Sequence, residues 1–229
     1  MINFTKEDKK IGQAIFIKFE YGRLNKFCWP ITPFSTIFKI LNNKERALID
    51  KILSVNPKNL GKTGKFYGIK PVPKNLVIIK NQKYEINGQT RKVKPQYLPR
   101  KVFSAYQKMN KAMCDDIDGS LNVLSGYRSP AYQLVIFFHY LYLNGWDLKK
   151  TFRGVTLPGW SEHGCPEKQA IDFAPVKGIE KLEDFYKIKE YKWLLKNANK
   201  FGFYLSFPKN NKSGIMFEPW HWHFKGAEE

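Results

Sequence analysis

Cysteine is scarce in this chain, and long apolar runs are absent. Three cysteines occur in 229 residues, Cys28, Cys114 and Cys165, without a Cys-x-x-Cys pair, so neither a disulfide framework nor a structural zinc knuckle is indicated. No stretch approaches the roughly 18 apolar residues that cross a bilayer, and the first ten residues lack the apolar segment of a secretory signal. The sequence therefore leaves two locations open: the cell envelope, if a signal has been removed, and the cytoplasm.

Arginine and acidic residues are also scarce relative to lysine. Only 6 of the 39 basic residues are arginines, 20 residues are acidic, and the net charge is +19. A field of this size attracts polyanions, but base-reading interfaces depend on the bidentate arginine fork, so the composition disfavours a nucleic-acid partner. The simplest interpretation is a lysine-rich, solvated surface, and an anionic polymer is the alternative partner.

The apolar spacing of the first hundred residues predicts few regular elements. Ala14–Tyr21 alternates as a strand would, and helical segments follow between residues 34 and 54. Residues 55–100 are rich in proline, glycine and lysine, which indicates a long connector with one short strand at Leu76–Ile79. The Gly61-Lys62-Thr63 tripeptide lacks the earlier glycine of a phosphate-binding loop and is set aside.

Beyond residue 100 the pattern is more regular. It predicts helices over Val102–Met113, Pro130–Asn144 and Leu182–Lys200, the second with Ser129 as its N-cap and Gly145 after its end. It predicts strands over Leu121–Leu124, Phe203–Phe207 and Ile215–Phe217. This order of elements favours an α+β fold in which helices flank a small antiparallel sheet.

Histidine is rare, and its distribution indicates a metal site. Three of the four histidines lie in two clusters, Ser161-Glu162-His163 … Asp172 and Glu218-Pro219-Trp220-His221-Trp222-His223. Zinc hydrolases hold the metal with three ligands from His, Asp, Glu and Cys and leave a fourth position for water, whose proton a nearby carboxylate accepts. One possible set has His163, Asp172 and His221 as ligands and Glu218 as the base.

The residues alone leave other ligand sets open. His221 and His223 are two apart, so on an unbroken strand they would share a face and could form a ligand pair, with Glu218 elsewhere. For Glu218 and His221 to converge on one metal, Pro219 must kink the chain. Cys165 is a candidate thiolate ligand, but a buried thiol without a metal role is the simpler interpretation because Asp172 already fills that position. His139, among aromatic residues of a predicted helix, is interpreted as a packing residue.

Four blocks in order resemble a known family. They are Ser125-Gly126-Tyr127-Arg128-Ser129 with Gln133, Pro158-Gly159-Trp160-Ser161-Glu162-His163 with Ala170-Ile171-Asp172-Phe173, Trp193–Ala198 with Phe201-Gly202-Phe203, and Glu218–Trp222. They are similar to the zinc D-Ala-D-Ala carboxypeptidases and dipeptidases of bacterial cell walls, the LAS metallopeptidases that include vancomycin-resistance carboxypeptidases. The resemblance runs from about Pro71 to Gly226. It predicts a catalytic domain over residues 71–229 and an N-terminal extension, residues 1–70, packed on it.

The resemblance implies a complete set of site residues. His163, Asp172 and His221 would hold one Zn²⁺ per chain in a cleft on the sheet, and Glu218 would be the general base. Arg128 would bind the substrate carboxylate or stabilise the oxyanion, and Ser161 and Gln133 would be polar contacts to the substrate. The implied partners are peptidoglycan stem peptides or muropeptides, with anionic cell-wall polymers as an additional attraction for the lysine-rich surface.

The implied activity is that of a D-alanyl-D-alanine carboxypeptidase. An L,D-carboxypeptidase, a D,D-dipeptidase and a cross-link endopeptidase (including phage lysins) share these motifs and stay open, as does a zinc-bound binding module without catalysis. The chain departs from the family pattern twice. His163 and Asp172 are nine positions apart instead of seven, and His223 stands where the family commonly has arginine.

Overall fold

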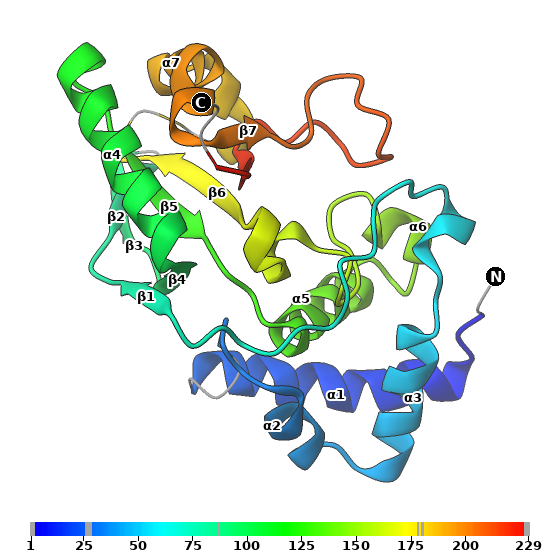
Figure 1. The fold of residues 1–229 in the computed structure, drawn as a ribbon. Helices are drawn as coiled ribbons and strands as arrows, with labels where there is room; N and C mark the ends of the chain where they lie inside the picture. Colours follow the sequence, from blue (N-terminus) through cyan, green and yellow to red (C-terminus); the bar gives the residue numbers. More distant parts are fainter. Residues whose placement is uncertain (1–2, 26–28, 87, 178, 180, 227–229) are drawn as a thin grey trace. The chain divides into compact units, whose positions relative to one another are not determined.

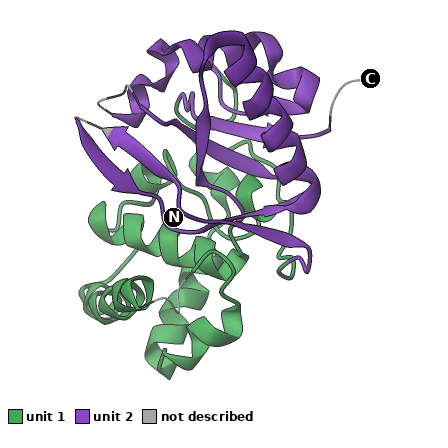
Figure 2. Cartoon of the chain, turned by 90° about the vertical axis from the view of Figure 1, so that its left-hand side faces the viewer, with its two compact units in different colours: residues 1–72, 128–164, 211–216 green, residues 73–127, 165–210, 217–229 purple. Residues whose placement is uncertain are grey.

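The computed structural model describes residues 3–25, 29–86, 88–177, 179 and 181–226 (Figure 1). These residues form helices and small antiparallel sheets, which confirms the predicted α+β class. None of the described helices is both long and apolar enough to cross a bilayer. Cys28 lies outside the described residues. The chain forms two compact units, and each is assembled from separate segments of the sequence (Figure 2).

Unit 1 comprises residues 1–72, 128–164 and 211–216 and is helical. Its elements are α1 (Lys6–Leu24), α2 (Phe34–Lys39), α3 (Asn43–Leu53), α5 (Pro130–Leu143) and α6 (Leu148–Thr151), with 3-10 helices at Pro57–Leu60 and Glu162–Gly164. Buried side chains of α1, α3 and α5 form one apolar core, among them Phe19, Ile49 and Phe138. The N-terminal segment thus shares a core with α5, and its origin as an extension of a catalytic domain stays a prediction.

Helix α1 contradicts the strand predicted over Ala14–Tyr21. A capping box begins the helix: the Asp8 backbone N donates to Thr5 Oγ1 at 3.0 Å, and the Thr5 backbone N donates to Asp8 Oδ2 at 2.8 Å. The buried residues Gly12, Ile15, Phe19 and Gly22 follow helical spacing. The apolar alternation over Ala14–Tyr21 was misleading because two of the apolar residues that it includes are exposed, Ile17 by 60% and Tyr21 by 61%.

Helix α5 begins as the sequence predicts. The Tyr132 backbone N donates to Ser129 Oγ at 3.0 Å, so Ser129 is the N-cap, and Pro130 occupies the first helical position. The Ser129 hydroxyl also donates to Thr32 O at 2.6 Å. These two hydrogen bonds of Ser129 therefore fix the backbone next to Arg128, the residue that precedes the cap.

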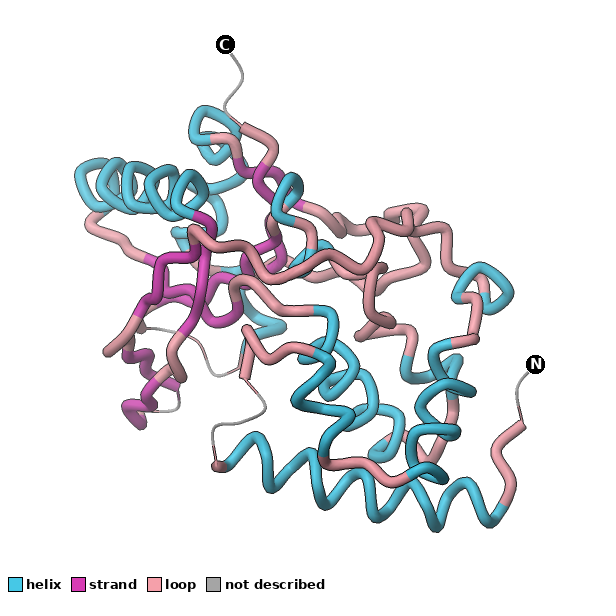
Figure 3. Tube along the Cα trace, turned by 60° about the horizontal axis from the view of Figure 1, so that its bottom comes forward, coloured by secondary structure: helices cyan, strands magenta, loops and turns pink. Residues whose placement is uncertain are grey.

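Unit 2 comprises residues 73–127, 165–210 and 217–229 and contains all described strands, drawn in magenta in Figure 3. Its main sheet has the order β5 (Leu121–Ser125), β6 (Ala170–Pro175), β8 (His221–Phe224) and β7 (Phe203–Leu205), all antiparallel. Two further pairs join β1 (Leu76–Ile79) to β4 (Gln96–Pro99) and β2 (Lys83–Ile86) to β3 (Gln89–Lys92).

One face of the main sheet carries the core of unit 2. Ile171 and Phe173 of β6 and Trp222 and Phe224 of β8 belong to an apolar cluster with side chains of α4 (Arg100–Ile117) and α7 (Lys189–Asn197). Because successive strand residues point to opposite faces, the residues between them point away from these helices. The two faces of the sheet therefore have separate roles, packing on one side and polar side chains on the other.

Several predicted elements of unit 2 differ from the structure. The long helix expected over Leu182–Lys200 is broken into a 3-10 helix at Leu182–Lys187, α7 and a 3-10 helix at Ala198–Phe201, because Ile188 between the first two is extended. The connector expected over 55–100 also contains β2, β3 and β4. No strand forms over Ile215–Phe217, which is an irregular segment among the described residues.

Candidate metal centre

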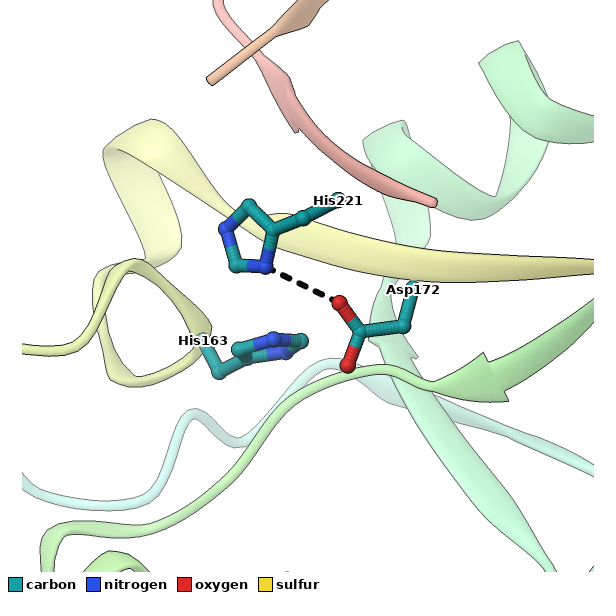
Figure 4. Close-up of side chains that lie close together, drawn as sticks. All are labelled: His163, Asp172 and His221. Atoms are coloured by element: carbon teal, nitrogen blue, oxygen red, sulfur yellow. Dashed lines mark hydrogen bonds and ion pairs between the residues drawn. The ribbon is translucent and has the colours of Figure 1, made fainter. Parts of the chain in front are cut away.

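Asp172 and His221 meet across the β6–β8 pair. They are register partners, they lie on the face of the sheet away from the helices, and both side chains are buried. His221 Nδ1 lies 2.9 Å from Asp172 Oδ1 (Figure 4). Because the strand pairing fixes the two Cα positions, the two side chains are held together by the backbone of the sheet and not by the polar contact alone.

Glu218 reaches the same place through a turn. The His221 backbone N donates to Glu218 O at 3.1 Å, and Trp222 Nε1 donates to Pro219 O at 2.9 Å, so the chain turns immediately before β8 begins. Glu218 Oε2 consequently lies 3.7 Å from His221 Nδ1, and the Glu218 side chain is buried. The kink expected at Pro219 is confirmed, and Glu218 does not follow the strand alternation of β8.

His163 lies in the 3-10 helix Glu162–Gly164 and is 2% exposed. Its backbone N donates to Ser161 Oγ at 3.3 Å, and its carbonyl accepts a hydrogen bond from the Arg128 backbone N at 3.0 Å. Arg128 directly precedes the cap of α5 and is half-buried. Arg128 and His163, which are 35 positions apart in the sequence, are therefore joined by a backbone hydrogen bond.

His163, Asp172 and His221 form one potential metal-binding group among the described residues. One ligand atom from each lies within 4.8 Å of the other two, and all three residues are buried (Figure 4). Zinc bonds of about 2.0–2.1 Å at tetrahedral angles separate two ligand atoms by about 3.3 Å. The contact of 2.9 Å and the limit of 4.8 Å bracket this value. Two imidazoles and one carboxylate are also the donor set of a three-ligand catalytic zinc site, so the residues fit the metal predicted from the sequence.

Comparison with known proteins agrees with this geometry. Residues 95–227, more than half of the chain, match the VanY family of D-alanyl-D-alanine carboxypeptidases. The chain belongs to the VanY family. The matched region includes Arg128, all three members of the His-Asp-His group and Glu218, so the family motifs and the buried group coincide. The resemblance stated from the four sequence blocks is thereby confirmed.

Individual relatives support the same assignment. YodJ of Bacillus subtilis (strain 168), which is named only as a carboxypeptidase, is 29% identical over 173 residues, which cover 68% of this chain and 62% of YodJ. The bifunctional D-Ala-D-Ala dipeptidase and carboxypeptidase VanXYC of Enterococcus gallinarum is 27% identical over 57% of this chain and 68% of its own. Among solved structures, the LD-carboxypeptidase LdcB is 29% identical with a TM-score of 0.55 and covers 68% of this chain and 70% of its own.

Ser161 and Gln133 bond within the protein. Ser161 Oγ accepts the His163 backbone N–H and thereby orients the residue that carries the imidazole. Gln133 is 2% exposed, and its Nε2 donates to Thr156 O at 2.7 Å. Their roles as substrate contacts stay predictions. Glu162 and Tyr67 have no role that the sequence predicts, yet Tyr67 Oη donates to the buried Glu162 at 3.3 Å, and Glu162 directly precedes His163.

Three further residues considered from the sequence lie outside the His-Asp-His group. His223 Nδ1 lies 2.7 Å from Ser206 Oγ, and its ring stacks on Tyr204. Cys165 Sγ lies 3.4 Å from Glu167 Oε2, within the lengthened segment between His163 and Asp172, which winds into a 3-10 helix at Pro166–Lys168. His139 packs on Phe16 and also contacts Glu20 Oε1 at 2.8 Å.

Proposed function

We propose that this member of the VanY family is a zinc-dependent D-alanyl-D-alanine carboxypeptidase that trims peptidoglycan stem peptides. The single observation that carries the proposal is the buried group of His163, Asp172 and His221 with the Glu218 carboxylate 3.7 Å from His221 Nδ1. A metal-ligand set and an adjacent carboxylate are the two parts of metal-assisted amide hydrolysis, in which the carboxylate accepts the proton of the attacking water. The chain spans 62% of YodJ, so the activity is inferred for the region that the two share.

In this proposal the three ligands hold one zinc ion, which polarises the scissile carbonyl and acidifies water when it is bound. Glu218 accepts the proton that the attacking water loses and returns it to the leaving amine of the terminal D-alanine. The turn at Glu218–His221 supports this role because it ties the carboxylate to the strand that carries a ligand. Burial of Glu218 supports this role further, because a carboxylate shielded from bulk water passes its proton to the leaving amine and not to the solvent.

Arg128 is proposed to bind the free carboxylate of the substrate. A carboxypeptidase needs a cation at a fixed distance from the reacting carbonyl to bind the terminal carboxylate, and a guanidinium offers a bidentate fork to a carboxylate. The hydrogen bond from the Arg128 backbone N to His163 O supports this role, because it couples the position of the arginine to that of a ligand. Ser161 and Gln133 are retained as proposed polar contacts to the substrate backbone.

An L,D-carboxypeptidase is the second candidate, and one observation favours it. LdcB, whose structure is similar to 68% of this chain at a TM-score of 0.55, is described as an LD-carboxypeptidase that recognises peptidoglycan. Both reactions remove a terminal D-alanine, and they differ in the residue that precedes the cleaved bond. The two activities require the same zinc ligands, base and carboxylate anchor, so the distinction depends on the substrate offered.

The test is hydrolysis of defined muropeptides by the purified zinc-loaded protein, with products identified by mass. A stem pentapeptide that ends in D-Ala-D-Ala should lose one alanine, and a tetrapeptide that ends in a single D-alanine should be a poor substrate. Free D-Ala-D-Ala and a cross-linked dimer test for dipeptidase and endopeptidase activity in the same assay. A chelator should abolish the reaction, and added zinc should restore it.

Each outcome has a distinct meaning. Faster loss of alanine from the tetrapeptide would replace the proposal by the L,D-activity, and cleavage of the dimer would make the protein an endopeptidase. Binding of zinc without hydrolysis of any of the four substrates would identify a binding module. Hydrolysis that persists in the chelator would contradict the zinc mechanism itself.

A further inference from the structure

Unit 2 has a cavity on the helical side of the main sheet. This cavity, of about 640 Å³, is bordered by α4, by the 3-10 helix Ala198–Phe201 and by Phe224 of β8. Phe224 points to the face of the sheet that packs on the helices, whereas Asp172 and His221 point to the other face. The cavity is therefore separate from the metal centre described above.

The side chains around this cavity carry charge of a single sign. Four are cationic, Arg100, Lys101, Lys108 and Lys200, and the nine described residues that line the cavity include no carboxylate. No acidic residue lies in the first turn of α4 to offset Arg100 and Lys101. The ion pairs on α4 itself and on the 3-10 helix Leu182–Lys187 use other lysines, Lys111 with Asp115 and Lys187 with Asp184. The positive charge at the cavity is thus not neutralised by these ion pairs.

The cationic side chains are spread along the cavity. Arg100, Lys101 and Lys108 occupy one side of α4, since their spacings of seven and eight residues correspond to about two turns. At a rise of 1.5 Å per residue, Arg100 and Lys108 are about 12 Å apart along the axis. A single small anion spans a fraction of this length. A ligand that engages the whole row must carry several negative charges at intervals.

The floor of the cavity is apolar. Phe201 is half-buried and stacks on Trp193 with ring centroids 6.0 Å apart, and Phe224 packs on Phe203 at 5.3 Å. Ala105 and Ser104 of α4 contribute small side chains beside them. Such a floor accepts the carbon faces of sugar or polyol units, while the surrounding cations take the charged groups.

We propose that this cavity binds a phosphodiester segment of a polyanionic polymer and holds the protein on it. Charge complementarity favours a polyanion, the spread of the cations favours a chain over a single ion, and the apolar floor favours repeating units with carbon faces. Three of the four cations are lysines, which attract phosphate as point charges. Sequence-specific recognition of nucleic acid depends on several bidentate arginine contacts to bases, and a single arginine does not supply them. The proposal does not depend on the peptidase activity.

The test compares two variants of equal net charge. The cavity variant changes Arg100, Lys101, Lys108 and Lys200 to glutamine. The control variant changes four exposed cations elsewhere to glutamine, Arg153 and the lysines Lys149, Lys192 and Lys196. Each set contains one arginine and three lysines, so each lowers the net charge from +19 to +15. Both variants should unfold within a few degrees of the natural protein, because all eight side chains are exposed, and thermal unfolding checks this.

The probes are poly(glycerol phosphate) and an oligothymidine with the same number of phosphodiesters, measured by titration at low and physiological salt. The cavity variant should bind poly(glycerol phosphate) roughly tenfold more weakly than the natural protein, whereas the control variant should change by less than about threefold, as expected for diffuse attraction. Equal losses in both variants would show that the whole surface charge binds the polymer and would overturn the proposal. Preferential loss of oligothymidine binding in the cavity variant would instead identify a nucleic-acid site.

Discussion

Replacement of Glu218 by glutamine is the most direct test of the proposed active site. Glutamine keeps the size and shape of the side chain and the turn, because the Glu218 backbone makes the bond to His221 N. It removes only the negative charge and the ability to accept a proton. The variant should therefore bind zinc at one ion per chain, as the natural protein should, and lose most of its turnover.

The size of the loss follows from the geometry. Glu218 Oε2 lies 3.7 Å from His221 Nδ1 and Glu218 is 8% exposed, so bulk water does not readily replace it as proton acceptor. General bases contribute about 10²- to 10⁴-fold to rate, and each factor of ten corresponds to about 1.4 kcal/mol of activation free energy. We expect kcat on a D-Ala-D-Ala pentapeptide to fall by roughly 10³-fold, or about 4 kcal/mol, with KM within about threefold of its natural value.

The matched control is Glu190→Gln. Glu190 is also 8% exposed and is also a glutamate, but it lies in the first turn of α7 on the helical side of the sheet. It should retain both zinc and activity. Zinc content is measured by metal analysis after gel filtration, and release of D-alanine is followed by mass spectrometry. If Glu218→Gln keeps more than about a tenth of the natural kcat, Glu218 is not the base. If it loses zinc, Glu218 is a ligand.

Three further outcomes are expected. His221→Ala should lose zinc and activity together, whereas His223→Ala should keep the metal, because His221 and not His223 belongs to the buried group; the reverse result in metal analysis would reassign the ligand. Phe19→Ala should lower the free energy of unfolding by about 3–5 kcal/mol, since the side chain is fully buried against Phe138. Ile17→Ala, at 60% exposure, should change it by less than about 0.5 kcal/mol, and equal losses for the two variants in urea unfolding would argue against helix α1. Burial raises the pKa of Tyr106 from 10.0 to about 12, so the folded protein keeps this proton where the unfolded chain loses it, and stability is lost as pH rises between these values. Between pH 9 and pH 11 the natural protein should lose about 1 kcal/mol more than Tyr106→Phe in urea unfolding, and identical losses would refute the assignment.

The sequence indicated the metal ligands more completely than it indicated the individual helices and strands. The two clusters that contain His163, Asp172 and His221 could be located because a metal site requires rare residue types and only four histidines occur in the chain, but the choice of these ligands over His223 or Cys165 came from the family resemblance. The role of Glu218 as the base stays a prediction. The lengthened segment between His163 and Asp172 does not disturb the His-Asp-His group. It forms a 3-10 helix at Pro166–Lys168, which ends before β6 begins and contains none of the three ligands. What the sequence could not supply is the backbone link from Arg128 N to His163 O, since hydrogen bonds between distant loops have no local pattern.

The missed elements have physical reasons. The strand predicted over Ala14–Tyr21 is part of a helix, because the alternation counted apolar residues that the structure leaves in solvent. The β2–β3 hairpin was missed because every residue of β3 is exposed, so no apolar alternation marks it. The Asn87-Gly88 pair between these strands was the available signal, as this dipeptide favours tight hairpin turns.

The alternation of β8 has a consequence for how the sequence can change. In four residues, two aromatic side chains belong to the core and two histidines point the other way. Removal of one residue within the strand would turn Trp222 outward and carry His221 into the apolar cluster, so core and metal group would be lost in one step. Only length changes by an even number keep each side chain on its own face. Insertions and deletions should therefore be tolerated better in the segment before Ala170 than inside the strands that follow, where a change by an odd number of residues exchanges the two faces.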